Sequence, residues 1–140
     1  LWSMNNNRRG DINAPNNIDV VKTIYDPCPV GFNVPTNGAF SGFTTSTTNG
    51  TNVPATFELN SGHIFWVNSS HTESIYFPAS GFRNAKDAIL KDALTSGNYW
   101  SADPQDYNNG CAMGFNKTEI KPLFRNIRTY GFAVRPVAEK

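Results

Sequence analysis

The segment Gly97-Asn98-Tyr99-Trp100-Ser101-Ala102 decides the expected fold, because it places two large aromatic residues side by side in an extended stretch. Side chains alternate between the two faces of a strand, so one ring can enter a core while its neighbour looks outward. We expect Trp100 to be the buried one, because the larger apolar body gains more free energy from leaving water. The segment therefore predicts a strand anchored by Trp100.

A polar run follows directly and is typical of a surface loop. Its sequence is Asp103-Pro104-Gln105-Asp106-Tyr107-Asn108-Asn109-Gly110. These residue types favour turns and local hydrogen bonds over packing in a core. A rigid aromatic anchor that opens into such a loop is how a scaffold presents a recognition surface. The pattern indicates binding and not catalysis.

Composition excludes several classes of function. The chain has 140 residues, enough for one domain with its own core, and its twelve Lys and Arg balance eleven Asp and Glu without charge blocks. Balanced charge argues against a nucleic-acid partner and against a basic membrane-surface helix. No apolar run is long enough to span a bilayer, so we expect no membrane insertion by this domain.

Metal and cofactor chemistry have no support in the spacing of the candidate ligands. Cys28 and Cys111 form no CxxC motif, and no zinc or EF-hand pattern is present. His63 and His71 are eight residues apart among Ser, Asn and Gly, which favours ordinary histidines at loop edges. We expect neither a metal nor a cofactor.

Local patterns predict mainly short strands. Ile64 to Val67 is apolar on both faces, so it should be a central strand in which Trp66 packs in the core. Thr36 could cap a short helix that runs to Phe43, and Ala85–Leu94 has helical spacing. The strands expected are 18–25, 56–59, 63–68, 74–79, 98–102, 111–115, 119–124 and 130–137.

Four motifs in a fixed order resemble a known family. They are Asp26-Pro27-Cys28-Pro29-Val30-Gly31-Phe32 with Val34-Pro35-Thr36, then Phe77-Pro78-Ala79-Ser80-Gly81-Phe82-Arg83, Tyr99-Trp100-Ser101-Ala102, and Gly131-Phe132-Ala133-Val134-Arg135-Pro136-Val137. Together they resemble the major paralogous domain family of surface proteins, which includes C-terminal modules of Bacteroidales fimbrillin-like lipoproteins. The resemblance covers about Lys22 to Val137.

The resemblance implies an α+β, C-type-lectin-like fold of short antiparallel strands with one or two short helices. In such a fold the N- and C-terminal strands pair, here Val20–Tyr25 with Phe132–Val137. It also implies strand and turn for Ala85–Leu94, and we prefer this to the helix because tertiary context overrides weak propensity. Residues 1–17 would be a polar lead-in, and residues 18–140 a single domain.

The sequence departs from the family in two respects. Pro136 stands where the family's commonest ending has a cysteine, so Cys28 cannot pair with the last strand; pairing with Cys111 stays open. The calcium-site motifs of sugar-binding C-type lectins are absent, so calcium-dependent sugar binding is not implied.

We therefore expect a non-enzymatic, adhesin-type binding module on the surface or fimbriae of a bacterium, extracellular or at the outer membrane. Its partner would be a glycan or a host or bacterial surface protein. The alternatives are a structural pilus or envelope subunit and a ligand-binding protein diversified by a retroelement. The structural anchors expected are Trp66, Trp100 and Phe132, and the ligand-binding residues expected are Asp103, Asp106, Tyr107, Asn108, Asn109, Asn116, Arg125, Asn126, Arg128 and Tyr130.

Overall fold

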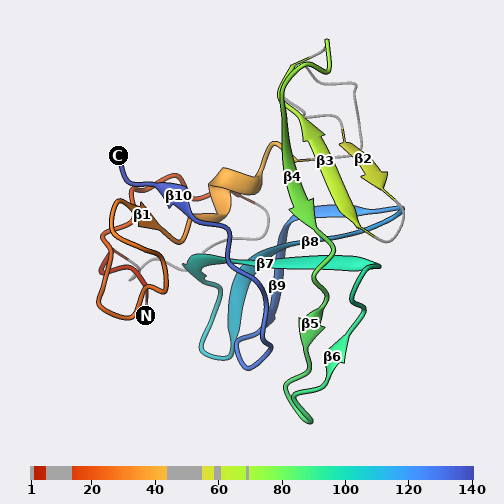
Figure 1. Cartoon of the computed structure of the whole chain (residues 1–140). Helices are drawn as coiled ribbons and strands as arrows, with labels where there is room; N and C mark the ends of the chain where they lie inside the picture. Colours follow the sequence, from red (N-terminus) through yellow and green to blue (C-terminus); the bar gives the residue numbers. More distant parts are fainter. Residues whose placement is uncertain (1, 6–13, 44–54, 59–60, 69) are drawn as a thin grey trace.

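Short strands joined by turns make up almost all of the regular structure in the computed structural model, which describes residues 2–5, 14–43, 55–58, 61–68 and 70–140 (Figure 1). The elements are β1 (Phe32–Asn33), the 3-10 helix η1 (Asn37–Phe40), β2 (Ala55–Glu58), β3 (Gly62–Trp66), β4 (Ser74–Pro78), β5 (Phe82–Arg83), β6 (Leu90–Lys91), β7 (Ser96–Pro104), β8 (Asn109–Asn116), β9 (Ile120–Ile127) and β10 (Val137–Ala138).

The strands form antiparallel sheets. The longest strands make the sheet β7-β8-β9, and a second sheet has the order β2-β3-β4, in which β3 is central as predicted. The pairs β5–β6 and β1–β10 complete the set. The β2-β3-β4 sheet stands beside β7 and β8 (Figure 1), which gives a sandwich-like arrangement.

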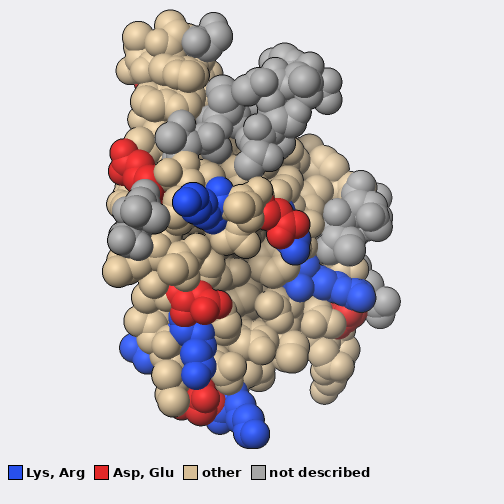
Figure 2. Space-filling model, turned by 90° about the vertical axis from the view of Figure 1, so that its right-hand side faces the viewer, with Lys and Arg blue, Asp and Glu red and all other residues tan. Residues whose placement is uncertain are grey.

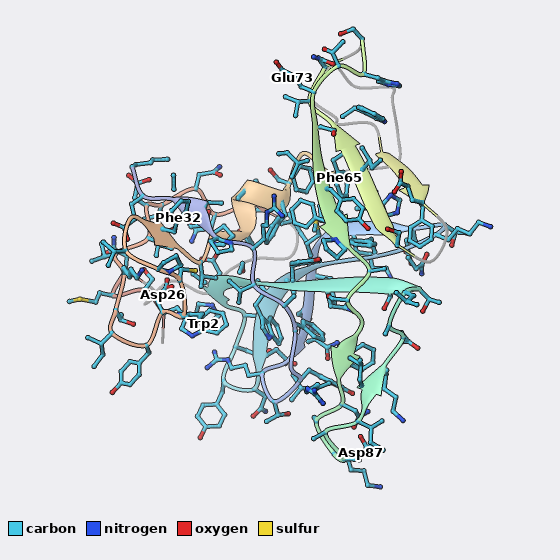
Figure 3. The ribbon with its side chains drawn as sticks, viewed as in Figure 1. Trp2, Asp26, Phe32, Phe65, Glu73 and Asp87 are labelled. Carbon is cyan, nitrogen blue, oxygen red and sulfur yellow. The ribbon has the colours of Figure 1, made fainter. Side chains whose placement is uncertain are left out.

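The main core lies between these two larger sheets. Phe65 of β3 and Phe77 of β4 are buried against Tyr99 of β7 and against Met113 and Phe115 of β8. Phe77 meets the Tyr99 ring edge to face, with 5.0 Å between ring centroids, a favourable geometry for aromatic pairs. Figure 3 shows Phe65 at the junction of the sheets. This packing fixes one face of β7.

The other face of β7 is also covered, which corrects one expectation. Trp100 is buried as predicted, with 7% of its surface exposed, but Tyr99 does not look outward and is 4% exposed. The Tyr99 hydroxyl donates to the carbonyl oxygen of Pro78 at 2.7 Å. Alternation along the strand holds, but each face of β7 meets its own apolar layer, formed by the β3–β4 core on one side and by Phe132 on the other.

The α+β expectation is wrong, because the only helix among the described residues is the four-residue η1. The Asn37 N–H donates to the Asp103 carboxylate, Gly38 packs so closely on Asn16 and Asn17 that a Cβ would clash there, and the helix ends at Phe40. In the 85–94 segment the left-handed φ angles of Ala88, Asp92 and Leu94 interrupt any helix. That segment is turn and strand, as we preferred.

The pairing of Val20–Tyr25 with Phe132–Val137 is also wrong. Residues 18–25 form no strand, and their one β-bridge joins Lys22 to Ser3. The last strand pairs instead with β1, where Phe32 faces Ala138 and Asn33 faces Val137. Before Val137 the 130–137 segment forms only isolated bridges, in which Gly131 pairs with Arg83 and Ala133 pairs with Tyr99.

The loop between Lys22 and β1 is held by two charged side chains. The Lys22 ammonium donates to the carbonyl oxygens of Cys28, Pro29 and Phe32 at 2.6–2.7 Å. The buried Asp26 carboxylate accepts from the backbone N–H groups of Cys28 and Val34. These contacts replace strand pairing in a stretch where two prolines remove backbone donors.

Trp66 does not lie where the sequence predicted. Trp66 is half-buried instead of packed in the core, and its ring stacks on His71 with 4.8 Å between centroids.

Residues 6–13 of the expected lead-in lie outside the described residues, whereas Ser3 is buried. Basic and acidic side chains are interspersed on the face in Figure 2. Among the described residues no helix is long and apolar enough to cross a membrane.

Candidate functional site

A cavity of about 330 Å³ opens beside the C-terminal end of β7. We call it the aromatic groove and define it by six of its lining residues: Trp2, Trp100, Arg128, Tyr130, Phe132 and Val134. Its size falls within the range of ordinary ligand sites, which are mostly apolar with a few polar groups. Figure 3 shows Trp2 close to the end of β7. The groove is the first element of the candidate site.

Stacked rings build one wall of the groove. The Trp100 ring lies on Phe132 with 4.4 Å between centroids and 27° between planes. The Trp100 indole N–H donates to the carbonyl oxygen of Tyr130 at 3.3 Å. On the neighbouring strand, a Cβ at Gly110 would lie 3.1 Å from the Trp100 ring, so glycine lets the ring lie flat across β8. The wall is therefore rigid before any ligand arrives.

The β7–β8 loop is organised by Asp106. Its carboxylate accepts from the backbone N–H groups of Asn108 and Asn109, both at 2.8 Å, and from the Asn109 side-chain amide. These bonds, the Asn109 amide first, lower the pKa of Asp106 below the ordinary carboxyl value. Tyr107 is left at the tip with 91% of its surface exposed. A fixed loop thus presents one free aromatic ring.

Arg128 joins this loop to the groove. Its backbone N–H donates to the carbonyl oxygen of Asn108 at 3.0 Å, and its Nε donates to that of Asn109 at 3.1 Å. Its Nη2 donates to the carbonyl oxygen of Asp106. Because Arg128 also lines the groove, its guanidinium holds the loop in place and adds positive charge at the rim. The structure thus brings together Asp106, Tyr107, Asn108, Asn109, Arg128 and Tyr130.

Asp103 has a structural environment. It is 2% exposed, and its carboxylate oxygens accept from the Asn37 backbone N–H and from the Asn16 side-chain amide, both at 2.5 Å. Burial raises the pKa of Asp103 above the ordinary carboxyl value, and these two bonds oppose the rise. Although Asp103 borders the groove, its carboxylate is already used inside the protein.

Of the remaining predicted residues, Arg125 interacts electrostatically with the cluster around Tyr107, because its charge adds to the hydrogen bonds that lower the pKa of Asp106. Asn116 lies at the far end of β8, where its side-chain oxygen accepts from the N–H groups of Thr118 and Glu119. Asn126 faces Gly110 across the sheet and Arg125 faces Cys111. Neighbours along a strand point to opposite faces, so Arg125 and Asn126 cannot serve the same side of the sheet.

Sequence reasoning missed Trp2 and Val134 as parts of the groove. Trp2 lies in a segment that looked like a polar lead-in, and its only signal is a large aromatic side chain among Ser and Asn residues. A solvated lead-in has no reason to carry a tryptophan, whereas the ring gains free energy by packing near Ala102 and Val134.

Both cysteines and His63 are buried inside the protein. Cys28 and Cys111 are both buried and form no disulfide with each other, and burial together with the nearby Asp26 raises the pKa of Cys28 to about 12. His63 is not at a loop edge as expected; it is buried in β3, and its Nε2 lies 2.9 Å from the carbonyl oxygen of Asn116. Among the described residues no group of three or more His, Cys, Asp or Glu could hold a metal ion.

The described residues form a small domain that is almost entirely β-structure and carries an aromatic groove. Residues 58–137 match the family model described as a domain of unknown function, DUF8237, and the chain belongs to that family. The match contains β3 to β9 and thus most of the groove. Neither the comparison with curated proteins nor that with solved structures found a match. The resemblance to surface lectin-like modules stays a prediction.

Proposed function

We propose that this domain is a non-enzymatic recognition module that binds a glycan or a protein through the aromatic groove and the adjoining loop at Tyr107. The observation that carries the proposal is the fully exposed Tyr107 ring on a loop fixed by Asp106 and Arg128, next to a cavity lined by aromatic rings. Rigid aromatic side chains with flanking amides give contact area at low entropic cost.

The chemistry of the site favours ligands with both flat apolar faces and hydrogen-bonding groups. Sugar rings and extended peptide segments have both. Tyr130 and Phe132 supply apolar surface, Asn108 supplies an exposed amide, and Arg128 supplies charge. We place such a module on a bacterial cell surface or fimbria, on the strength of the four motifs that resemble surface proteins.

Binding screens with matched tyrosine variants test the proposal. The domain is screened on a glycan array and against a panel of bacterial and host surface proteins, and hits are measured by calorimetry. Tyr107→Ala should weaken binding about tenfold or more, because exposed tyrosines that become buried dominate binding energy. Tyr25→Ala is the control, since Tyr25 is also exposed, at 67%, but does not line the groove.

The two tyrosine substitutions should differ in their effect on ligand affinity but not in their effect on thermal stability. Both tyrosine variants should unfold at the temperature of the wild-type protein, because neither ring is packed. If a ligand is found and Tyr107→Ala binds it as tightly as Tyr25→Ala does, the site lies elsewhere on the molecule.

A further inference from the structure

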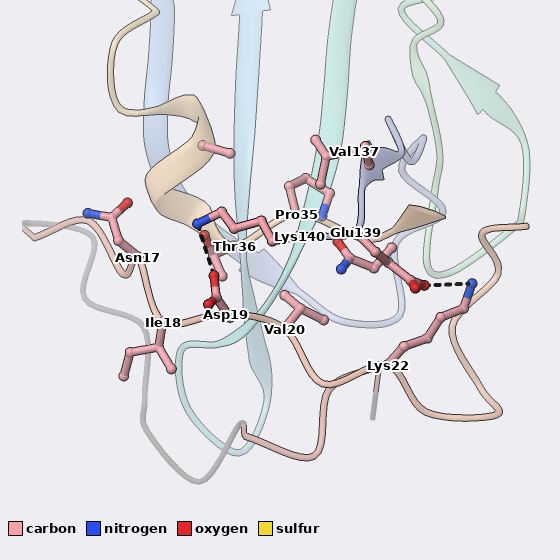
Figure 4. Close-up of a pocket in the computed structure, with 13 residues that line it drawn as sticks. Asn17, Ile18, Asp19, Val20, Lys22, Pro35, Thr36, Val137, Glu139 and Lys140 are labelled. Atoms are coloured by element: carbon pink, nitrogen blue, oxygen red, sulfur yellow. Dashed lines mark ion pairs between the residues drawn. The ribbon is translucent and has the colours of Figure 1, made fainter. Parts of the chain in front are cut away.

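A second cavity, of about 450 Å³, lies between the segment 17–22 and the C-terminal residues 137–140 (Figure 4). It shares no lining residue with the aromatic groove. Ile18, Val20, Pro35 and Val137 give it apolar walls. Its volume suits a ligand, and the chemistry of its two long sides shows which kind.

One side of the cavity is an unpaired strand edge. At the Ser3–Lys22 bridge, the N–H of Met4 donates to the carbonyl oxygen of Val21, and the N–H of Thr23 donates to that of Trp2. Backbone groups of successive residues in an extended segment point to alternate edges. The N–H and C=O groups of Val20 and Lys22 therefore point away from residues 2–4. The part of the chain that the structure describes offers these four groups no hydrogen-bond partner.

The opposite side is a second edge. In the β1–β10 pair Ala138 faces Phe32, and the N–H of Glu139 donates to the carbonyl oxygen of Gly31 at 3.0 Å. By the same alternation, the N–H and C=O groups of Ala138 point away from β1. No acceptor or donor for them is found among the described residues, and Ala138 lines the cavity.

Only side chains connect the two edges across the cavity. Lys140 Nζ lies 2.9 Å from an Asp19 carboxylate oxygen, and Lys22 Nζ lies 3.9 Å from one of Glu139 (Figure 4). These two ion pairs join the segment 17–22 to the C-terminal residues across the cavity. Two strands that flank a third lie about 9.5 Å apart, a gap that such long side chains bridge and backbone hydrogen bonds do not.

We propose that this cavity binds an extended peptide segment of a second protein, which adds a β-strand along the backbone edges at Val20–Lys22 and Ala138. Main-chain hydrogen bonds would supply the affinity, as in other strand-addition sites. The apolar walls select small apolar side chains, and the two acidic and two basic rim residues cancel, which selects a peptide without net charge. The mostly exposed Asp19–Lys140 pair is weak enough to open.

The probe is a phage-displayed library of random nine-residue peptides selected on the whole chain. Selected peptides are synthesised, and amide hydrogen exchange is measured with and without them. The amides of Val20, Lys22 and Ala138 should become protected in the complex. Ala138→Pro removes one open N–H without breaking a bond of the free protein, and proline is tolerated at an outward-facing edge position. Ala138→Pro should weaken peptide binding about tenfold, whereas Ala138→Ser, which keeps the N–H, should bind the peptide with the affinity of the wild-type protein.

Three outcomes would overturn the proposal. One is a selection in which no peptide protects these amides. Another is a folded Ala138→Pro variant that binds as tightly as Ala138→Ser. The third is a concentration-dependent dimer of the chain alone with the same amides protected, which would make the occupant a second copy. If Ala138→Pro does not fold, amide exchange in the wild-type complex tests the proposal, which still requires protection of Val20, Lys22 and Ala138. Tyr107→Ala should leave peptide binding unchanged, so the test of this site is independent of the test of the aromatic groove.

Discussion

Asp103 shows how one polar residue can look like a ligand group in the sequence and serve as a brace in the fold. It follows the anchor strand and begins a turn-rich run, a pattern that predicted exposure. The structure instead uses its carboxylate to join Asn16 and Asn37, two residues far away in the sequence. Composition identifies a residue that hydrogen-bonds, but only the tertiary structure determines its partners.

Removing this brace should destabilise the domain. Asp103→Ala leaves the Asn37 N–H and the Asn16 amide without their acceptor, at a cost of about 1–3 kcal/mol in the free energy of unfolding. The loss is partly offset because the burial that raises the pKa of Asp103 also penalises its charge. Urea unfolding measures the change. The control Asp19→Ala removes an exposed ion pair and should cost no more than about 1 kcal/mol. Equal midpoints for the two variants would mean that the brace contributes nothing.

At the scale of single elements, local patterns predicted the strands in the middle of the chain but not those expected near its two ends. The expected strands 56–59, 63–68, 74–79, 98–102, 111–115 and 119–124 correspond to β2, β3, β4, β7, β8 and β9. Prediction failed for 18–25 and 130–137, where similar residue types form irregular segments. The 18–25 segment pairs only through the Lys22–Ser3 bridge, and Pro136 has no backbone N–H to donate to a ladder in the 130–137 segment.

The β7–β8 hairpin loop should respond to acid. The Asp106 carboxylate accepts these hydrogen bonds more strongly when it is ionised, so its pKa in the folded state lies below the unfolded value of about 3.9. A lowered pKa contributes stability that is present above the unfolded value and is lost as the pH falls through the folded one. In NMR titrations, the amide shifts of Asn108 and Asn109 should therefore move together with a midpoint below about 3.9. Asp106→Asn should abolish this step, and a midpoint at or above 3.9 would contradict the loop geometry.

Whole-molecule topology was the least predictable level. Two of the sequence motifs meet in the fold, since the rings of Trp100 and Phe132 stack, and this contact was not predicted. The family resemblance then implied an α+β fold and a long terminal pairing, whereas the described residues form one 3-10 helix and only a short pairing between β1 and β10. Of the expected ligand-binding residues, Tyr107, Asn108 and Arg128 lie together, and the adjoining groove is also lined by Trp2, more than a hundred residues away in the sequence. Long-range contacts of this kind leave no periodic signal in a single sequence.

The Trp100 side chain joins three parts of the molecule. It belongs to β7, its ring packs on Gly110 of β8, and it stacks on Phe132 near the C-terminus. Trp100→Ala should lower the free energy of unfolding by about 3–5 kcal/mol, as expected for truncating a buried aromatic residue. Trp66→Ala is the matched comparison: the same atoms are removed from a half-buried ring that stacks on His71, so the cost should be clearly smaller. Thermal and urea unfolding followed by circular dichroism measure both. If Trp66→Ala proves the more damaging change, the fold is organised around the β2-β3-β4 sheet and not around β7.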